Sequence, residues 1–138
     1  MRFMVIVKAT KESESGQMPD EQMLAAMGKF NEELVKAGVM LAGEGLHPSA
    51  KGVRISFAGG KKKVTDGPFS ETKELIAGYW LLQTKSKEEC IEWIKRAPFA
   101  EGEVEIRQVH EVEDFAASDP TGQLREQEKR LRDTVRAR

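Results

Sequence analysis

Cysteine is almost absent from this sequence of 138 residues, which contains only Cys90. A single cysteine excludes an internal disulfide framework and a structural zinc site built on several thiolates. Long hydrophobic runs are lacking too, because the apolar stretch from Phe3 to Val7 is shorter than a signal-peptide core or a membrane span and Lys8 ends it. We therefore expect a cytoplasmic protein with no membrane association.

An excess of either charge is also missing, since 22 Lys and Arg residues stand against 23 Asp and Glu residues and the formal net charge is −1. Proteins that bind nucleic acid usually carry a basic excess or a basic stripe, because phosphate contacts dominate their affinity. The tight basic run from Lys61 to Lys63 alternates between faces if it lies in a strand. Gly59-Gly60 lacks the following helix that a phosphate-binding loop needs. We expect no nucleic-acid partner and no cofactor.

Hydrophobic patterns succeed one another in a regular order along the chain. Apolar residues at helical spacing predict a helix from Asp20 to Ala37, with Asp20 as its N-cap and Gly38 at its end. Ser86 and Glu89 have the spacing of a capping box and begin a second helix. Alternating or continuous apolar runs predict strands at about 3–7, 39–46, 53–57, 61–65, 75–82 and 103–109, and the polar stretch 11–16 is predicted as a loop.

This order predicts an α+β fold, the ferredoxin-like β-α-β-β-α-β arrangement with an inserted hairpin around Gly59-Gly60. The helices are expected to cover one face of an antiparallel sheet. The strand at 75–82 is apolar on both faces, so the second face needs a cover as well. The simplest cover is a second copy of the chain, which predicts a homodimer.

The last part of the chain differs in character. We expect one domain over residues 1–115 and a charged tail over 116–138, with a helix that has Ser118 or Asp119 as its cap and Pro120 at its first position. Leu124, Leu131 and Val135 are its sparse apolar residues. A surface or intersubunit helix and a disordered tail are the two alternatives.

One segment carries a family resemblance: Thr65-Asp66-Gly67-Pro68-Phe69-Ser70-Glu71-Thr72-Lys73-Glu74. Together with 41–46, Gly78-Tyr79-Trp80 and 103–109, it resembles the DGPF group within the YCII-related families, over about residues 2–115. The resemblance implies a dimeric α+β barrel.

The resemblance also bears on function. Some members of these families are similar to dehydrochlorinases or isomerases of small ring compounds, and others are encoded beside extracytoplasmic-function sigma factors. In the YCII branch a histidine–aspartate pair has been suggested as catalytic. This sequence has only His47 and His110, with no histidine in 20–37, so that pair is not carried over.

Two carboxylates are the candidates for acid–base chemistry. Asp66, beside a glycine at a strand end, suits a general base, although an Asp-Gly-Pro turn alone accounts for the same residues. Glu71 lies three residues before Glu74, and on a helical turn the two would share one face as an acid–base pair. A charged loop is the alternative for this pair.

Cationic and aromatic residues are the candidates for binding. Arg54, Lys73 and Arg107 suit an anionic substrate or, alternatively, ion pairs with nearby glutamates. Tyr79 and Trp80 lie on opposite faces of one predicted strand, where they line a pocket or pack in the core. Glu44 and His47 fall on opposite faces and lack a third ligand, so no metal site is expected and His47 is interpreted as a loop residue.

Three functions remain open on the sequence. The first is the binding or conversion of a small cyclic or anionic organic molecule in a dimer-enclosed pocket, with Asp66 and Glu71 as the acid–base groups. The second is a regulatory role without catalysis, as a partner of an extracytoplasmic-function sigma factor. The third is a structural dimer whose interior is filled by its own side chains. Fold analogy alone does not choose between these functions.

Overall fold

The structure is a computed structural model that describes residues 1–71 and 74–138. Its contacts divide the chain into two compact units, Met1–Gln108 and Val109–Arg138, each of which is described by itself. The domain boundary that the sequence places after residue 115 stays a prediction. None of the described helices combines the length and the apolar character that a membrane span requires.

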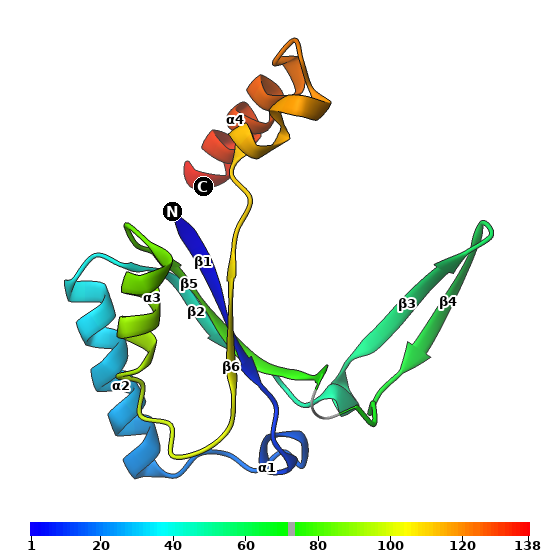
Figure 1. Ribbon diagram of the computed structural model, residues 1–138. Helices are drawn as coiled ribbons and strands as arrows, with labels where there is room; N and C mark the ends of the chain where they lie inside the picture. The colour runs from blue at the N-terminus through cyan, green and yellow to red at the C-terminus, as the bar shows by residue number, and fades with distance from the viewer. Residues whose placement is uncertain (72–73) are drawn as a thin grey trace. The chain divides into compact units, whose positions relative to one another are not determined.

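The first unit is built on a four-stranded sheet with the strand order β2-β5-β1-β6 (Figure 1). All neighbouring strands are antiparallel, and Val5 pairs with Trp80 on one side and with Ile106 on the other. The connections run through the helices α2 and α3. This topology confirms the predicted ferredoxin-like α+β arrangement. The bounds are β1 (Arg2–Lys8), α2 (Glu21–Lys36), β2 (Met40–Gly45), β5 (Ile76–Gln83), α3 (Lys87–Ile94) and β6 (Val104–Gln108).

One face of the sheet packs against α2 and α3 and forms the hydrophobic core. Alternate residues of a strand point to the same face, which places Phe3, Val5 and Leu82 under the helices, where each is almost completely buried. The helices contribute Phe30, Leu34 and Cys90 to the same cluster.

The predicted beginning of the first long helix is confirmed. The Asp20 carboxylate accepts a hydrogen bond from the Met23 amide at 2.8 Å, and Gly38 follows the helix with a φ of 73°.

The other face of the sheet is only half-buried. The strand register places Glu44, Tyr79, Ile6 and Glu105 in one row across the four strands. Ile6, Tyr79 and Leu81 keep part of their surface exposed, and Met4 is 36% exposed. This face, referred to below as the open face, therefore joins an apolar centre to charged residues on the two outer strands, where Glu105 forms ion pairs with Lys8 and Arg107.

The inserted hairpin forms a sheet of its own. Strands β3 (Val53–Ala58) and β4 (Lys61–Asp66) pair with each other and with no other strand among the described residues (Figure 1). Gly59 and Gly60 form the turn with φ values of 56° and 78°, which other residues adopt only with strain. The predicted hairpin is thus confirmed.

Short helical turns are the elements that the sequence patterns missed. The stretch 11–16, predicted as a loop, contains the helix α1 (Lys11–Glu14), which Thr10 and Ser13 cap reciprocally. A single turn of helix carries no apolar periodicity, so its pattern is that of a polar loop. The turn η1 (Ser49–Lys51), which follows Pro48, was not predicted for the same reason.

The second unit consists of η3 (Val112–Ser118) and α4 (Gln123–Arg136). The predicted helix is present, but it begins at Gln123, after Pro120. Its N-cap position is Gly122 rather than the predicted Ser118 or Asp119. The Asp119 carboxylate nevertheless accepts hydrogen bonds from the amides of Leu124 at 3.3 Å and Arg125 at 2.9 Å in the first turn. These amide hydrogen bonds, that from Arg125 first, lower the pKa of Asp119 against the opposing effect of desolvation.

Candidate functional site

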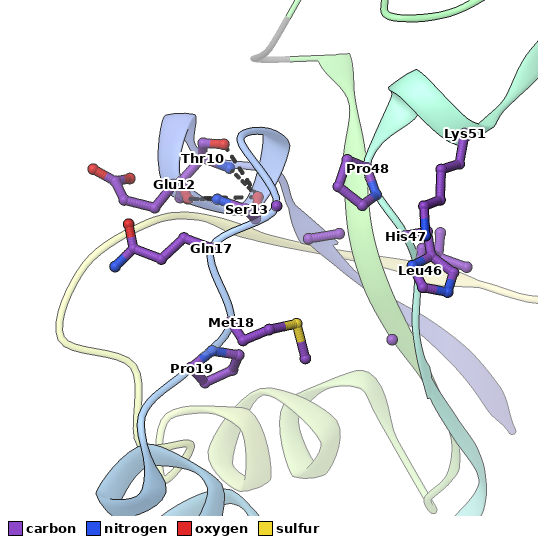
Figure 2. A pocket seen from close by; sticks show the side chains of 13 residues that line it. Thr10, Glu12, Ser13, Gln17, Met18, Pro19, Leu46, His47, Pro48 and Lys51 are labelled. Atoms are coloured by element: carbon purple, nitrogen blue, oxygen red, sulfur yellow. Dashed lines mark hydrogen bonds between the residues drawn. The ribbon is translucent and has the colours of Figure 1, made fainter.

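A cavity of about 860 Å³ lies in the first unit, between the segment that joins β1 to α2 and the chain that leaves β2 (Figure 2). This volume is within the range of small-molecule sites. We call it the main cavity. Its lining comes from Thr10, Glu12, Ser13, Gly16, Gln17, Met18, Pro19, Gly45, Leu46, His47, Pro48, Lys51 and Ala77.

The walls of the main cavity combine apolar surface with a few polar side chains. Met18 and Pro19 lie on one side and Leu46 on the other, as Figure 2 shows. His47 and Lys51 accompany Leu46, whereas Glu12 belongs to the opposite wall. The cation and the imidazole on one wall can orient an anionic group above the apolar surface, whereas Figure 2 shows the Glu12 carboxylate turned away from them.

A hydrogen-bonded serine holds the two walls together. The Ser49 hydroxyl donates to one carboxylate oxygen of Glu14 at 2.5 Å, and the Ser49 amide donates to the other at 3.0 Å. The same hydroxyl accepts a hydrogen bond from the Phe69 amide at 3.0 Å. Ser49 therefore ties α1, η1 and the Asp-Gly-Pro-Phe segment to one point beside the cavity.

The Asp-Gly-Pro-Phe segment itself approaches η1 closely. The Gly67 amide donates to the Gly52 carbonyl at 2.9 Å, and a Cβ added at Gly67 would lie 1.8 Å from the Ser49 carbonyl oxygen. The peptide bond from Gly67 to Pro68 is cis. Only a residue without a side chain fits at Gly67, so this segment has an evident structural role.

A smaller cavity of about 290 Å³ adjoins the main one and shares Pro19, Gly45 and Ala77 with it. Trp80 contributes to its lining and donates from its indole nitrogen to the Asn31 side-chain oxygen at 2.9 Å. The remaining residues around it include Met27, Glu44, Tyr79 and Phe99.

Trp80 is fixed from several sides. Its ring meets that of Phe30 edge to face at a centroid distance of 5.7 Å, and that of Phe99 lies 6.0 Å away. A Cβ at Gly43 would come within 2.8 Å of the indole. The indole is therefore a rigid part of the wall of the smaller cavity.

The predicted binding residues Tyr79 and Trp80 both line the smaller cavity, although they belong to opposite faces of β5. Trp80 also packs in the core, as the alternative interpretation had it. The sequence did not predict Glu12 and Lys51, because the short turns α1 and η1 carry them and no periodic pattern marks such turns. It did not predict Asn31 either, because a single polar residue on the long helix α2 does not stand out from the helix's other polar positions.

The structure brings two other predicted residues together outside the cavities. Arg54 forms an ion pair with Glu71 at 3.4 Å, and its guanidinium lies 3.8 Å from the centre of the Phe69 ring. Asp66 is exposed at the end of β4, opposite Val53. The described linings of the two cavities include neither Asp66 nor Glu71.

Arg107 and Lys73 complete the predicted set. Arg107 is exposed on the open face and lies 3.8 Å from Glu105. Lys73 is outside the described residues. The roles assigned to Asp66, Glu71, Arg54, Lys73 and Arg107 stay predictions.

Metal sites and activated thiols are two further types of functional site. Within 1–71 and 74–138, no three His, Cys, Asp or Glu side chains gather in a way that could hold a metal ion. Burial, followed by the charge of Glu89, raises the pKa of the Cys90 thiol to about 11. Cys90 is thus a packed core residue rather than an activated nucleophile.

Several known proteins are similar to this chain. An uncharacterized protein of Rhizobium meliloti is 28% identical over 91 residues, which cover 64% of this chain and 73% of that protein. A solved 5-chloro-2-hydroxyhydroquinone dehydrochlorinase from Burkholderia phenoliruptrix, in complex with 2,5-dihydroxybenzoquinone, is 17% identical with a TM-score of 0.40, over 80% of this chain and 96% of that one. The family model of the YCII-related domain matches residues 1–113. The chain therefore belongs to the YCII-related domain family, as the resemblance around Asp66-Gly67-Pro68-Phe69 predicted.

Proposed function

We propose that this protein binds a small organic molecule in the main cavity. The observation that carries the proposal is the cavity itself, whose volume of about 860 Å³ suits such a ligand and whose walls join apolar surface to the polar side chains of His47 and Lys51. Membership of the YCII-related family is compatible with this function but does not specify a ligand.

The chemistry of the walls supports a ligand with an anionic group and an apolar, ring-sized body. Lys51 and His47 lie on the same wall and offer donors to a carboxylate or a phenolate. Met18, Pro19 and Leu46 offer apolar contacts to the rest of the molecule. The smaller cavity lies directly beside this site, because the two cavities share Pro19, Gly45 and Ala77.

Conversion of the ligand by carboxylate acid–base chemistry extends the same proposal. Glu12 is the carboxylate that lines the main cavity, and His47 lies on the wall across from it. Asp66 and Glu71 are the carboxylates of the family motif. Once a substrate is found, the turnover rates of the double variant Asp66→Asn/Glu71→Gln and of the single variant Glu12→Gln will be compared. The comparison will show whether the motif carboxylates or Glu12 take part in the reaction. Unchanged turnover in the first variant would remove the motif carboxylates from the mechanism.

The binding proposal is tested by titrating the full chain with benzoate and salicylate and following the ligand signals by NMR. We expect saturable binding that weakens about tenfold in Lys51→Gln, because a charge-assisted hydrogen bond to the carboxylate is lost. Lys62→Gln is the matched control, since Lys62 is an exposed lysine of β4 outside the cavity lining. Equal affinities in the two variants would contradict the assigned orientation, and absence of saturable binding by either probe would contradict the proposed ligand class.

A second candidate function, supported by α4, is docking to a protein partner. Leu124, Leu131 and Val135 form one stripe at helical spacing and are 63%, 54% and 60% exposed. Such a stripe fits a hydrophobic groove on another protein. An extracytoplasmic-function sigma factor is the partner that the family resemblance implies. Leu131→Asp should abolish co-purification with that sigma factor, and Arg130→Asp, one position away, should leave it intact.

A reducing cytoplasmic location is part of the proposal. Cys90 is a free and buried thiol, which needs no oxidising compartment. Fractionation of the source cells with immunodetection of the chain tests the location. Recovery outside the cytoplasmic fraction would contradict it.

A further inference from the structure

The smaller cavity has a floor that carries no side chains beside Trp80. In the register of β2 and β5, Gly43 lies opposite Trp80. Two residues further along, Gly45 lies opposite Gly78. Opposite residues of an antiparallel pair share a face of the sheet, and so do residues two apart in one strand. The three glycines therefore lie on the helix-facing side, where Trp80 meets Phe30 of α2.

The space above this floor is filled at one glycine and open at the next. A Cβ added at Gly43 would come within 2.8 Å of the Trp80 indole, so that ring occupies the space above Gly43. A Cβ added at Gly45 would meet nothing within 4 Å apart from its chain neighbours. The hollow above Gly45 is thus available to a ligand.

Aromatic and thioether groups surround this hollow. The ring centroids of Trp80 and Phe99 are 6.0 Å apart and their planes are inclined by 59°, and Met27 lines the cavity from α2. Aromatic rings pack well against tilted rings, and a methionine sulfur also contacts aromatic rings favourably. An apolar cavity of about 150 Å³ can bind one benzene molecule, so the cavity of about 290 Å³ has room for one ring.

Asn31 supplies a hydrogen-bond donor to the same cavity. The Trp80 indole nitrogen can only donate, so its hydrogen bond of 2.9 Å holds the Asn31 side-chain oxygen towards the indole. The Asn31 side-chain nitrogen carries two hydrogens and donates to no residue within 1–71 and 74–138. Half-buried polar groups of this kind are usually matched by a partner, and an acceptor atom of a ligand would match this one.

From these observations we infer that the smaller cavity binds an uncharged aromatic ring that carries a hydrogen-bond acceptor, such as an aryl ketone. The ring lies above Gly45 and packs against Trp80 and Phe99, and its acceptor receives a hydrogen bond from the Asn31 amide. Gly45 and Asn31 are then the specificity-determining residues, the first for the space and the second for the acceptor. The inference holds whether or not the main cavity contains a ligand.

Charged rings match the lining less well. The described lining contains no Lys, Arg or His, so it offers no cation to an anionic group. An ammonium group has no acceptor for the Asn31 donors. Glu44 is the one charged residue of the described lining, and it lies opposite Tyr79 in the row of the open face, so its side chain points to the other side of the sheet.

The test compares acetophenone, which carries a carbonyl acceptor, with ethylbenzene, which has a similar shape and no acceptor. Each is titrated into the isotope-labelled full chain, and the indole N–H signals of Trp80 and Trp93 are followed by NMR, with Trp80→Phe to assign them. We expect acetophenone to shift the Trp80 signal saturably, because Trp80 lines the cavity and Trp93 does not. A shift confined to Trp93, or no saturable shift, overturns the inference.

Asn31→Asp tests the donor without breaking the contact to the indole. At about pH 8 the aspartate is ionised, so it still accepts from Trp80 but no longer donates to the ligand. The preference for acetophenone over ethylbenzene should fall about tenfold. Gln22→Glu is the matched control, since it makes the same chemical change on the exposed side of α2. Equal preferences in the two variants overturn the role of Asn31.

Gly45→Val tests the space. Gly45 is not one of the glycines with positive φ, and valine suits a strand, so the variant should fold. Its side chain enters the hollow and should weaken both ligands at least about tenfold. Unchanged binding overturns the location of the ring, and the Asn31→Asp comparison does not depend on this variant.

Two further measurements separate this inference from the other ligand classes and from the main cavity. Benzoate or benzylamine that shifts the Trp80 signal with higher affinity than acetophenone overturns the choice of an uncharged ring. Lys51→Gln, which should weaken benzoate in the main cavity, should leave acetophenone binding unchanged, because Lys51 is outside the described lining of the smaller cavity. A loss of acetophenone binding in Lys51→Gln overturns the assignment to the smaller cavity.

Discussion

Replacing Gly67 by alanine tests the close approach between the Asp-Gly-Pro-Phe segment and η1. The added Cβ would lie 1.8 Å from the Ser49 carbonyl oxygen and 2.7 Å from its carbonyl carbon, whereas ordinary contacts begin at 3.4 Å. Both neighbours are backbone atoms, so no rotation of a side chain relieves the overlap. The two segments have to move apart, and the cost falls on the contacts between them.

The magnitude follows from those contacts. Separation breaks the hydrogen bond from the Gly67 amide to the Gly52 carbonyl and the one from the Phe69 amide to the Ser49 hydroxyl. Each contributes about 1 kcal/mol, and overpacking adds about 1–3 kcal/mol. We therefore expect Gly67→Ala to lower the free energy of unfolding by about 3–5 kcal/mol.

Urea denaturation followed by tryptophan fluorescence is a suitable assay, because both tryptophans, Trp80 and Trp93, belong to the first unit. Gly28→Ala is the matched control. Gly28 lies inside α2, and a Cβ there meets nothing within 4 Å, so alanine should stabilise the helix by about 0.5–1 kcal/mol. A Gly67→Ala variant within about 1 kcal/mol of the wild type would refute the reasoning.

Three further predictions concern single side chains. Ser49→Ala removes a charge-assisted hydrogen bond to Glu14 and should cost about 2–3 kcal/mol in urea denaturation; a change below about 0.5 kcal/mol contradicts this. Cys90, with its raised pKa, should react with iodoacetamide at pH 8 at least about 100-fold more slowly in the native protein than in urea. Asp119 stabilises the second unit above its ordinary pKa of 3.8, and this contribution disappears as the pH falls through the lower folded value. Asp119→Asn should remove that acid transition from the helical circular dichroism signal, and an unchanged transition contradicts the assignment.

The fold was largely predictable because its long elements carry strong periodic patterns. The continuous apolar run at 75–82 and the apolar stripe on α2 both follow from burial, which the sequence therefore records directly. The Gly59-Gly60 turn was predictable from the conformation that it demands. By contrast, α1 and η1 depend on local caps and on contacts with distant segments, which leave no periodic trace.

The candidate site was predictable only in part for the same physical reason. Trp80 and Tyr79 lie on a strand that the apolar pattern predicts, so the sequence showed that they point to opposite faces of the sheet. It did not show the cavity beside them. Glu12 and Lys51 belong to segments that are distant in the sequence and approach each other only in the folded chain. Asp66 and Glu71 stand out in the sequence because their motif is dense in polar and turn residues, and Gly67 and Phe69 show that close packing accounts for much of that motif.

The hairpin begins and ends at nearly the same place. Two hydrogen bonds, from Gly67 to Gly52 and from Phe69 to Ser49, join the segment after β4 to the segment before β3. The insertion is therefore free to lengthen or shorten in evolution without altering the cavity beside its base. Among relatives, the length of this hairpin can therefore change independently of the residues that line the cavity.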